Sequence, residues 1–161
     1  MPTFERVLEA DPSIDRVVIG ATWRSVFARS SEYRIEGDSP GGEPGRTKAL
    51  TALGAMIGRL VQNGKQVFVI LQVPSADELD PGLMWTRSLL GGGSMRVRPL
   101  TVATFQERVG DLFLDDIGSV AAAAGAVVLD PTPALSRDGV YIAVDENGPV
   151  RTDGIHLRSG F

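Results

Sequence analysis

The sequence predicts a three-layer α/β/α sandwich built on a parallel sheet. Three segments are nearly continuous apolar runs: Arg16–Ala21, Gln66–Val73 and Ala126–Asp130. Such runs are typical of parallel strands that are covered on both faces, whereas strands with one wet face alternate apolar and polar residues. The segments between the runs have helical spacing, and strand–helix–strand alternation with right-handed crossovers builds this class of fold. At 161 residues, we expect the chain to form one domain, residues 1–161.

Helical spacing of apolar residues predicts three helices between and before these runs. The first long helix spans Arg46–Asn63 and ends at Gly64, the residue type favoured just past a helix C-terminus. A second long helix is predicted from Thr104, where a Thr-x-x-Glu pattern has the form of a capping box, and Gly125 closes it. A shorter helix, Thr3–Ala10, precedes the first strand. The apolar positions that define the two long helices are Leu50, Leu53, Ile57, Leu60 and Val61, then Phe105, Val109, Leu112, Phe113 and Val120.

Glycine and proline predict two loops and a hairpin. Gly37–Gly45 is too rich in both residue types to be regular structure. Pro74–Pro99 is also a predicted loop, with one or two helical turns around Leu83–Leu90. It leaves the carboxyl end of the central strand, the edge where open α/β sheets bind ligands, so it is interpreted either as a lid or acceptor-binding loop or as a surface insertion. Val140–Val144 and Pro149–Thr152 flank an Asn-Gly pair and predict a small hairpin.

Composition and charge exclude several classes of protein. Hydrophobic residues make up 43% of the chain and charged residues 22%, an ordinary globular balance. The net charge of −4, with arginines scattered among acids, disfavours nucleic-acid binding. Because the chain has no cysteine and one histidine, disulfides and thiolate zinc sites are excluded, and we expect neither a metal nor another cofactor. The apolar runs are much shorter than the roughly 20 residues that cross a bilayer, so the chain as given is expected to be soluble.

The only histidine, His156, lies three residues after Asp153 and just beyond the predicted hairpin. It is the one obvious proton shuttle at neutral pH. A histidine that acts as a general base needs a partner that fixes its tautomer and stabilises the imidazolium, and an aspartate on a preceding turn can supply both. Asp153 and His156 are therefore a candidate acid–base pair. The alternative is a histidine that only fills the last turn.

Candidates for the other catalytic roles carry weaker signals. The strand end Gly20–Trp23 lies at the expected ligand-binding edge, so its backbone N–H groups or the Thr22 hydroxyl are candidate oxyanion donors. Trp23 is interpreted either as a wall of the site or as a cap on the core. Ser39, preceded by Gly and Asp, is a weak nucleophile candidate because it lies inside a Gly/Pro loop instead of directly between a strand and a helix.

Several blocks occur along the chain in a recognisable order. A strand ends in Ala-Thr-Trp at Trp23, a helix ends in Gly64-Lys65, and a strand runs into Pro74. Val128–Pro131, a short hairpin and Asp153-x-x-His156-Leu157 then follow. This order, over most of the chain, resembles the SGNH-type domain fused to the C-terminus of membrane O-acyltransferases of acyltransferase family 3. The resemblance implies a flavodoxin-like sandwich with a Ser-His-Asp triad, in which His156 is the general base and Asp153 its orienting acid. It also places Thr22 where simpler SGNH hydrolases have an oxyanion asparagine.

The resemblance implies partners and a compartment as well. The family's domain acts with a transmembrane domain to move an acyl group, often acetyl, onto an extracytoplasmic glycan. The implied partners are therefore an acyl donor, a glycan or other hydroxyl acceptor, and a membrane acyltransferase domain, and the implied location is periplasmic or at the cell surface.

The chain also departs from the family pattern. The family's Gly-Asp-Ser block lies on a strand upstream of the Trp-bearing strand, and the sequence predicts no such strand here. We therefore expect the chain to lack the first βα unit and the closing helix, and to be inactive by itself in acyl transfer. We also expect it to expose a sheet edge that favours a homo-oligomer.

Two other functions remain open from the sequence. A free-standing carbohydrate or lipid esterase would use the same residues with water as the acceptor. A non-catalytic α/β module would bind a glycan or a protein partner and would not need the His156 imidazole as a base.

Overall fold

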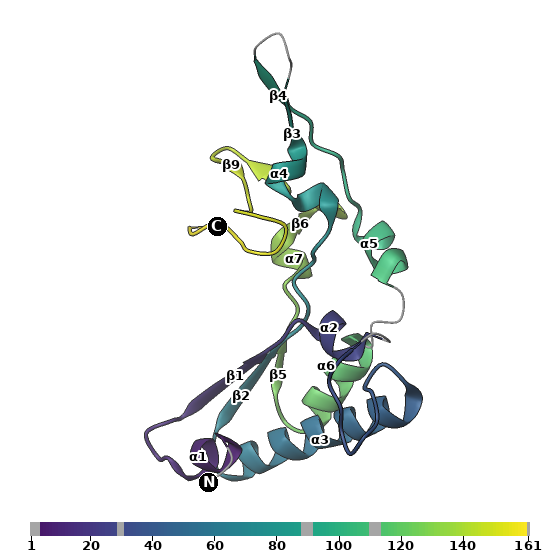
Figure 1. Cartoon of the computed structure of the whole chain (residues 1–161). Coiled ribbons are helices and arrows are strands. Elements are labelled where there is room, and N and C mark those ends of the chain that lie inside the picture. Colours follow the sequence, from purple (N-terminus) through teal and green to yellow (C-terminus); the bar gives the residue numbers. More distant parts are fainter. Residues whose placement is uncertain (1–3, 29–30, 88–91, 110–113, 161) are drawn as a thin grey trace. The chain divides into compact units, whose positions relative to one another are not determined.

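The computed structural model describes residues 4–28, 31–87, 92–109 and 114–160. They form two compact units (Figure 1). The first unit is Met1–Gln72 with Asp111–Pro131, and the second is Val73–Gly110 with Thr132–Phe161. Each unit has a buried hydrophobic cluster of its own.

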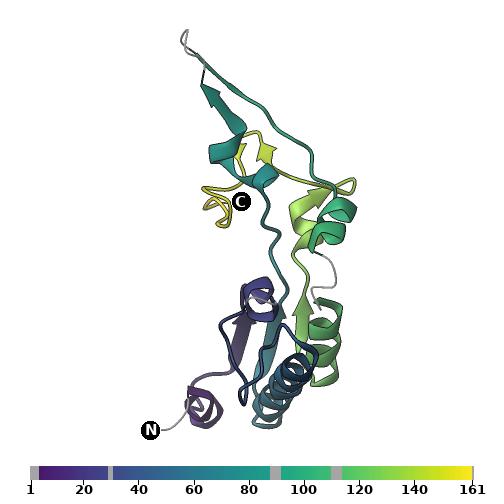
Figure 2. The same ribbon diagram turned by 45° about the vertical axis from the view of Figure 1, so that its right-hand side comes forward.

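The first unit contains a three-stranded parallel sheet (Figure 2). The strands are β1 (Arg16–Gly20), β2 (Gln66–Ile70) and β5 (Val127–Leu129), in the order β1-β2-β5. Val18 pairs with Phe68, and Phe68 pairs with Val127. Each strand lies within one of the apolar runs, which confirms the predicted α/β class and the parallel sheet.

The helices of the first unit are α1 (Phe4–Ala10), α2 (Trp23–Phe27), α3 (Glu43–Gln62) and α6 (Leu114–Ala123). The longest, α3, begins after the N-cap Gly42, so the predicted loop ends three residues earlier than expected from its glycines. A proline in the first turn explains this start, since its fixed φ suits that position and it needs no N–H partner there. The helix ends at Gln62, one residue before the predicted end, and Gly64 has a φ of 78°, the left-handed conformation that glycine adopts readily.

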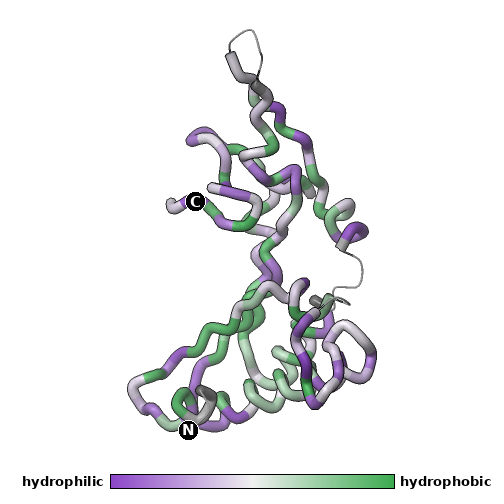
Figure 3. The backbone as a smooth tube through the Cα atoms, viewed as in Figure 1, coloured by the Kyte–Doolittle hydropathy of each residue, from purple (hydrophilic) through white to green (hydrophobic). Residues whose placement is uncertain are grey.

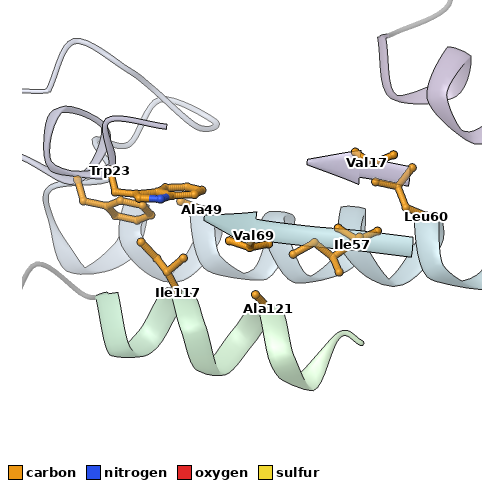
Figure 4. Close-up of a cluster of buried hydrophobic side chains, with 10 residues drawn as sticks. Val17, Trp23, Ala49, Ile57, Leu60, Val69, Ile117 and Ala121 are labelled. Carbon is orange, nitrogen blue, oxygen red and sulfur yellow. The ribbon is translucent and has the colours of Figure 1, made fainter. Parts of the chain in front are cut away.

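The core of this unit lies between the sheet and the helices α3 and α6 (Figure 4). Ile57 of α3, Val69 of β2 and Ile117 of α6 are fully buried in it. The two helices approach closely at Gly54 of α3. A Cβ added to this glycine would lie 3.0 Å from Cγ1 of Val120 in α6. Much of each strand has hydrophobic colouring (Figure 3), in keeping with the apolar runs of the sequence.

The opposite face of the sheet is exposed to solvent. Val18 is 61% exposed, and its neighbours on the same face, Val127 and Leu129, are also exposed. The connections β1-to-β2 and β2-to-β5 cross the sheet in the same direction, and right-handed crossovers then place both connecting helices on one face. Among the described residues of this unit, α3 and α6 cover that face, and the second helical layer expected of a three-layer sandwich is not seen over the other.

The second unit is made of short elements. They are η1 (Asp77–Leu79), α4 (Pro81–Met84), β3 (Trp85–Arg87), β4 (Gly93–Met95), α5 (Val102–Val109), α7 (Thr132–Leu135), β6 (Ser136–Arg137), β7 (Val140–Tyr141), β8 (Val144–Asp145) and β9 (Gly148–Pro149). The strands pair as antiparallel hairpins β3–β4, β6–β7 and β8–β9. Their cluster includes Phe105 and Tyr141, whose rings meet edge to face at 5.4 Å.

The predicted capping box at Thr104 is wrong by one turn. Helix α5 begins at Val102, and the Thr101 hydroxyl accepts a hydrogen bond from the Thr104 N–H at 3.0 Å. Thr101 therefore caps the helix, and Thr104 lies inside its first turn. The single long helix predicted to run on to Gly125 corresponds to α5 and α6, which belong to different units, and residues 110–113 between them lie outside the described residues.

The predicted loop Pro74–Pro99 contains more structure than its glycines and prolines indicate. The helical turn expected around Leu83–Leu90 is α4, which ends at Met84, and the chain then forms β3; residues 88–90 lie outside the described residues. The hairpin predicted at Asn147 is confirmed as β8–β9, but it is shorter than predicted, because Val140 and Tyr141 pair with β6 instead. In the described part of the chain, no helix has the length and apolarity needed to span a bilayer.

Candidate functional site

Asp153 and His156 lie on a tight turn near the end of the second unit. The turn is closed by an antiparallel bridge between Arg151 and Leu157. The Thr152 N–H also donates to the carbonyl of His156 at 3.0 Å. The backbone therefore brings the two side chains together, as the sequence predicts.

The Asp153 carboxylate makes three hydrogen bonds within this turn. Its Oδ1 accepts the backbone N–H groups of Ile155 and His156, both at 2.7 Å. Its Oδ2 lies 2.8 Å from Nδ1 of the His156 ring. One oxygen thus fixes the carboxylate on the backbone, and the other is aimed at the imidazole.

These hydrogen bonds determine the charge of Asp153 and the position of the proton that it shares with the ring. The bond from the His156 ring, and then the two backbone N–H donors, hold the pKa of Asp153 well below its ordinary value. Asp153 is therefore ionised at neutral pH and acts only as an acceptor, so Nδ1 of His156 must carry the shared proton. In the neutral ring, Nε2 is then the basic nitrogen. The ring is 74% exposed, so a hydroxyl group can reach it from solution.

A buried arginine that the sequence analysis missed supports the turn. Arg151 is 4% exposed, and its guanidinium donates to the carbonyl of Ile155 at 2.9 Å and to the carbonyl of Pro74 at 2.5 Å. Burial lowers the pKa of this guanidinium, and the nearby Asp153 carboxylate acts in the opposite direction. No local pattern marks Arg151, because Pro74 is 77 residues away along the chain.

A second contact holds the same turn to the segment that follows the central strand. The Ser75 hydroxyl donates to the carbonyl of Gly154 at 3.1 Å. A Cβ added to Gly154 would lie 3.2 Å from Oδ2 of Asp80, so this position is crowded for a larger residue. The sequence offered no signal for either contact. Among the residues that the structure describes, no group of three or more His, Asp or Glu could hold a metal ion.

We expect Arg151→Ala to destabilise the second unit by about 2 kcal/mol, because two carbonyls lose a charged donor and one of them is buried with it. The measurement is urea unfolding followed by circular dichroism. Arg137→Ala, an exposed arginine of the same unit, is the matched control and should change stability by less than about 0.5 kcal/mol. Equal losses in the two variants would contradict a supporting role for Arg151.

Thr22 and Trp23 belong to the first unit, at the carboxyl end of β1. Trp23 is 6% exposed, and its indole N–H donates to the carbonyl of Ile70 at 2.8 Å. The ring thus belongs to the hydrophobic core, as one of the two sequence interpretations has it, while a further role as a site wall stays a prediction. Thr22 is exposed and precedes α2, and its hydroxyl does not cap that helix. Its predicted role as an oxyanion donor is compatible with this position and stays a prediction.

Comparison with models of protein families shows which family the chain belongs to. The family model described as "SGNH domain (fused to AT3 domains)" matches residues 2–159. The chain is an SGNH domain. No curated protein and no solved structure gave a significant match. Membership supports an acyl-transfer or esterase-like module whose partner is a membrane acyltransferase domain.

Ser39 occupies a turn of the SGNH domain just before α3. Its hydroxyl accepts the Gly41 N–H at 3.3 Å, and its carbonyl oxygen would lie 2.1 Å from a Cβ added to Gly45. The carboxylate of the preceding Asp38 forms an ion pair with Lys48 at 2.7 Å. Ser39 and the Asp153–His156 pair belong to different units. As a nucleophile, Ser39 stays a weak prediction.

Proposed function

We propose that this SGNH domain supplies the acid–base pair for transfer of an O-acyl group, such as acetyl, to a hydroxyl of an extracytoplasmic glycan. Asp153 is the orienting acid and His156 the general base. The observation that carries the proposal is the 2.8 Å contact between Asp153 Oδ2 and His156 Nδ1, together with the two backbone donors that fix the carboxylate. Family membership supports acyl chemistry as the reaction class.

In the proposed step, a hydroxyl oxygen attacks the carbonyl carbon of an acyl donor while Nε2 of His156 takes the hydroxyl proton. The imidazolium that forms is stabilised by the Asp153 carboxylate, which stays ionised. The tetrahedral intermediate then collapses, the bond to the leaving group breaks, and the imidazolium returns the proton to that group. With a serine as the first attacking hydroxyl, a second round on the glycan hydroxyl completes a Ser-His-Asp sequence.

We propose further that the chain transfers acyl groups poorly by itself. An activated serine needs hydrogen-bond contact with its base and an oxyanion donor nearby. Ser39 instead has its hydroxyl in a local turn and its backbone packed against Gly45. A catalytic hydroxyl for this pair is therefore expected to come from the substrate or from the membrane acyltransferase partner.

Hydrolysis of a carbohydrate or lipid ester is the second candidate, and one observation favours it. The His156 ring is 74% exposed, so water reaches Nε2 as easily as a sugar hydroxyl does. An esterase releases the free acid whether or not an alcohol acceptor is present, whereas a transferase forms the new ester when the acceptor is added.

A fluorophosphonate probe followed by mass spectrometry tests the proposal on the chain alone. We expect no serine to be labelled, and the same result for Ser39→Ala. Labelling of Ser39 that is lost in His156→Ala would make the chain a self-sufficient serine enzyme and would overturn the second part of the proposal. A glycan that binds His156→Ala and the unaltered chain equally well, with no turnover by the chain and its membrane partner together, would instead assign a non-catalytic binding module.

A further inference from the structure

In the hairpin β3–β4 of the second unit, two large apolar residues share one face and two hydroxyl residues share the other. Trp85 and Met95 are directly opposite each other in the antiparallel register, so their side chains share a face. The Trp85 ring lies over Gly93, because a Cβ added there would be 3.7 Å from Cε3 of the ring. Thr86 and Ser94 occupy the other face, and their hydroxyl oxygens are 3.0 Å apart.

The apolar face of this hairpin is not buried by the protein. Trp85 is 55% exposed, and Met95 is also exposed. Leu83 in the preceding turn, 57% exposed, and Val97 just after β4 extend the apolar surface along the chain. A two-stranded hairpin that exposes a tryptophan and a methionine, with an exposed leucine and valine beside it, indicates a surface that is covered in use.

The stretch of chain between Asp80 and Glu107, which contains the hairpin, is basic in sequence, although the whole chain is acidic. Residues 81–106 contain three arginines, Arg87, Arg96 and Arg98, and no acidic residue, although the chain carries a net charge of −4. The backbone N–H of Arg96 donates to the carbonyl of Met84 at 2.8 Å, one residue beyond each strand of the hairpin. This hydrogen bond holds the basic segment beside the hairpin. A second copy of the chain would bring the same positive charges to the same place, so self-association is disfavoured.

We propose that the hairpin β3–β4 binds the surface of an anionic lipid bilayer, with the Trp85–Met95 face entering the interface and Arg96 and Arg98 contacting lipid phosphates. Tryptophan is the aromatic residue best suited to the boundary between headgroups and acyl chains. Arginine side chains next to an apolar face add attraction to anionic lipids. This surface goes beyond the proposed acyl transfer and does not depend on it.

Vesicle binding tests this proposal on the whole chain. The vesicles are made of phosphatidylglycerol and phosphatidylcholine in equal parts, or of phosphatidylcholine alone, and binding is read by co-sedimentation and tryptophan emission. The chain has two tryptophans, and Trp23 is already buried, so a blue shift on binding reports Trp85. We expect binding and a blue shift with the anionic vesicles, and Trp85→Phe should bind without the shift.

Variants separate the apolar and electrostatic contributions. We expect Trp85→Ser with Met95→Ser, and separately Arg96→Gln with Arg98→Gln, each to weaken vesicle binding about tenfold or more. The matched control, Arg24→Gln with Arg137→Gln, removes the same charge from exposed positions elsewhere and should bind within about twofold of the unaltered chain. His156→Ala should bind normally, which separates this proposal from the catalytic one.

Two outcomes would overturn the proposal. The first is unchanged vesicle binding by the Trp85/Met95 variant that circular dichroism shows to be folded. The second is no binding to anionic vesicles combined with a dimer in sedimentation that this variant abolishes, which would assign the apolar face to a second copy of the chain.

Discussion

Asp153→Asn is expected to lower acyl transfer by the chain and its membrane partner by about a thousandfold or more, with the fold unchanged. The asparagine carbonyl can still accept the N–H groups of Ile155 and His156, so the turn persists. Its NH₂ group, however, would face His156 Nδ1, which must then act as an acceptor. The ring proton moves to Nε2, and the nitrogen that serves as base in the native pair no longer has a lone pair for the substrate hydroxyl.

The same substitution has a readout that does not require turnover. Nitrogen NMR of the neutral imidazole should show the proton on Nδ1 in the native chain and on Nε2 in Asp153→Asn. Asp138→Asn is the matched control, since Asp138 is exposed at a φ of 51°, a conformation that asparagine tolerates well. The assignment of Asp153 as orienting acid fails if the native ring carries its proton on Nε2, or if both Asp→Asn variants keep full activity.

Gly45→Ala is expected to destabilise the first unit by about 3 kcal/mol or more. The added Cβ would lie 2.1 Å from the carbonyl oxygen of Ser39 and 2.4 Å from its carbonyl carbon. Both are backbone atoms, so a side-chain rotation cannot relieve the overlap. The segment before α3 would have to move, and the turn that holds Ser39 would be lost with it.

Gly58→Ala is the matched control in the same helix. Nothing lies within 4 Å of a Cβ added there, so the higher helix propensity of alanine should stabilise α3 by about 1 kcal/mol. Thermal unfolding of the two variants gives the comparison. If Gly45→Ala and Gly58→Ala shift the melting temperature in the same direction, the close packing of the Ser39 turn on α3 is wrong.

The regular elements of the first unit could be predicted because their signals are local. The strands at Arg16, Gln66 and Val127 are short runs of apolar residues, and their burial requires only that a sheet forms. The start of α5 was misplaced because two threonines three residues apart, Thr101 and Thr104, are both acceptable caps. The choice between them depends on where the chain leaves the bridge between Thr101 and Val140, which is a long-range contact.

The residues of the candidate site also fall into those that a local sequence pattern predicts and those that depend on long-range contacts. Asp153 and His156 were found together because a three-residue separation lets a turn join them without help from the rest of the chain. Arg151 and Ser75 were missed because their partners come from the opposite end of the second unit's sequence. Arginine side chains are usually exposed. Only the folded structure shows that the side chain of Arg151 is buried and donates hydrogen bonds to two carbonyls.

The sequence by itself determined the α/β class, the parallel strands and the Asp153–His156 pair. These features depend on apolar periodicity and on hydrogen bonds between residues that are close in sequence. Only the tertiary structure decided that both crossovers place their helices on one face of the sheet, that Trp23 is a core residue and that Trp85 is exposed on an amphipathic hairpin. These features depend on which segments pack together, and burial is a property of that packing and not of the residue type.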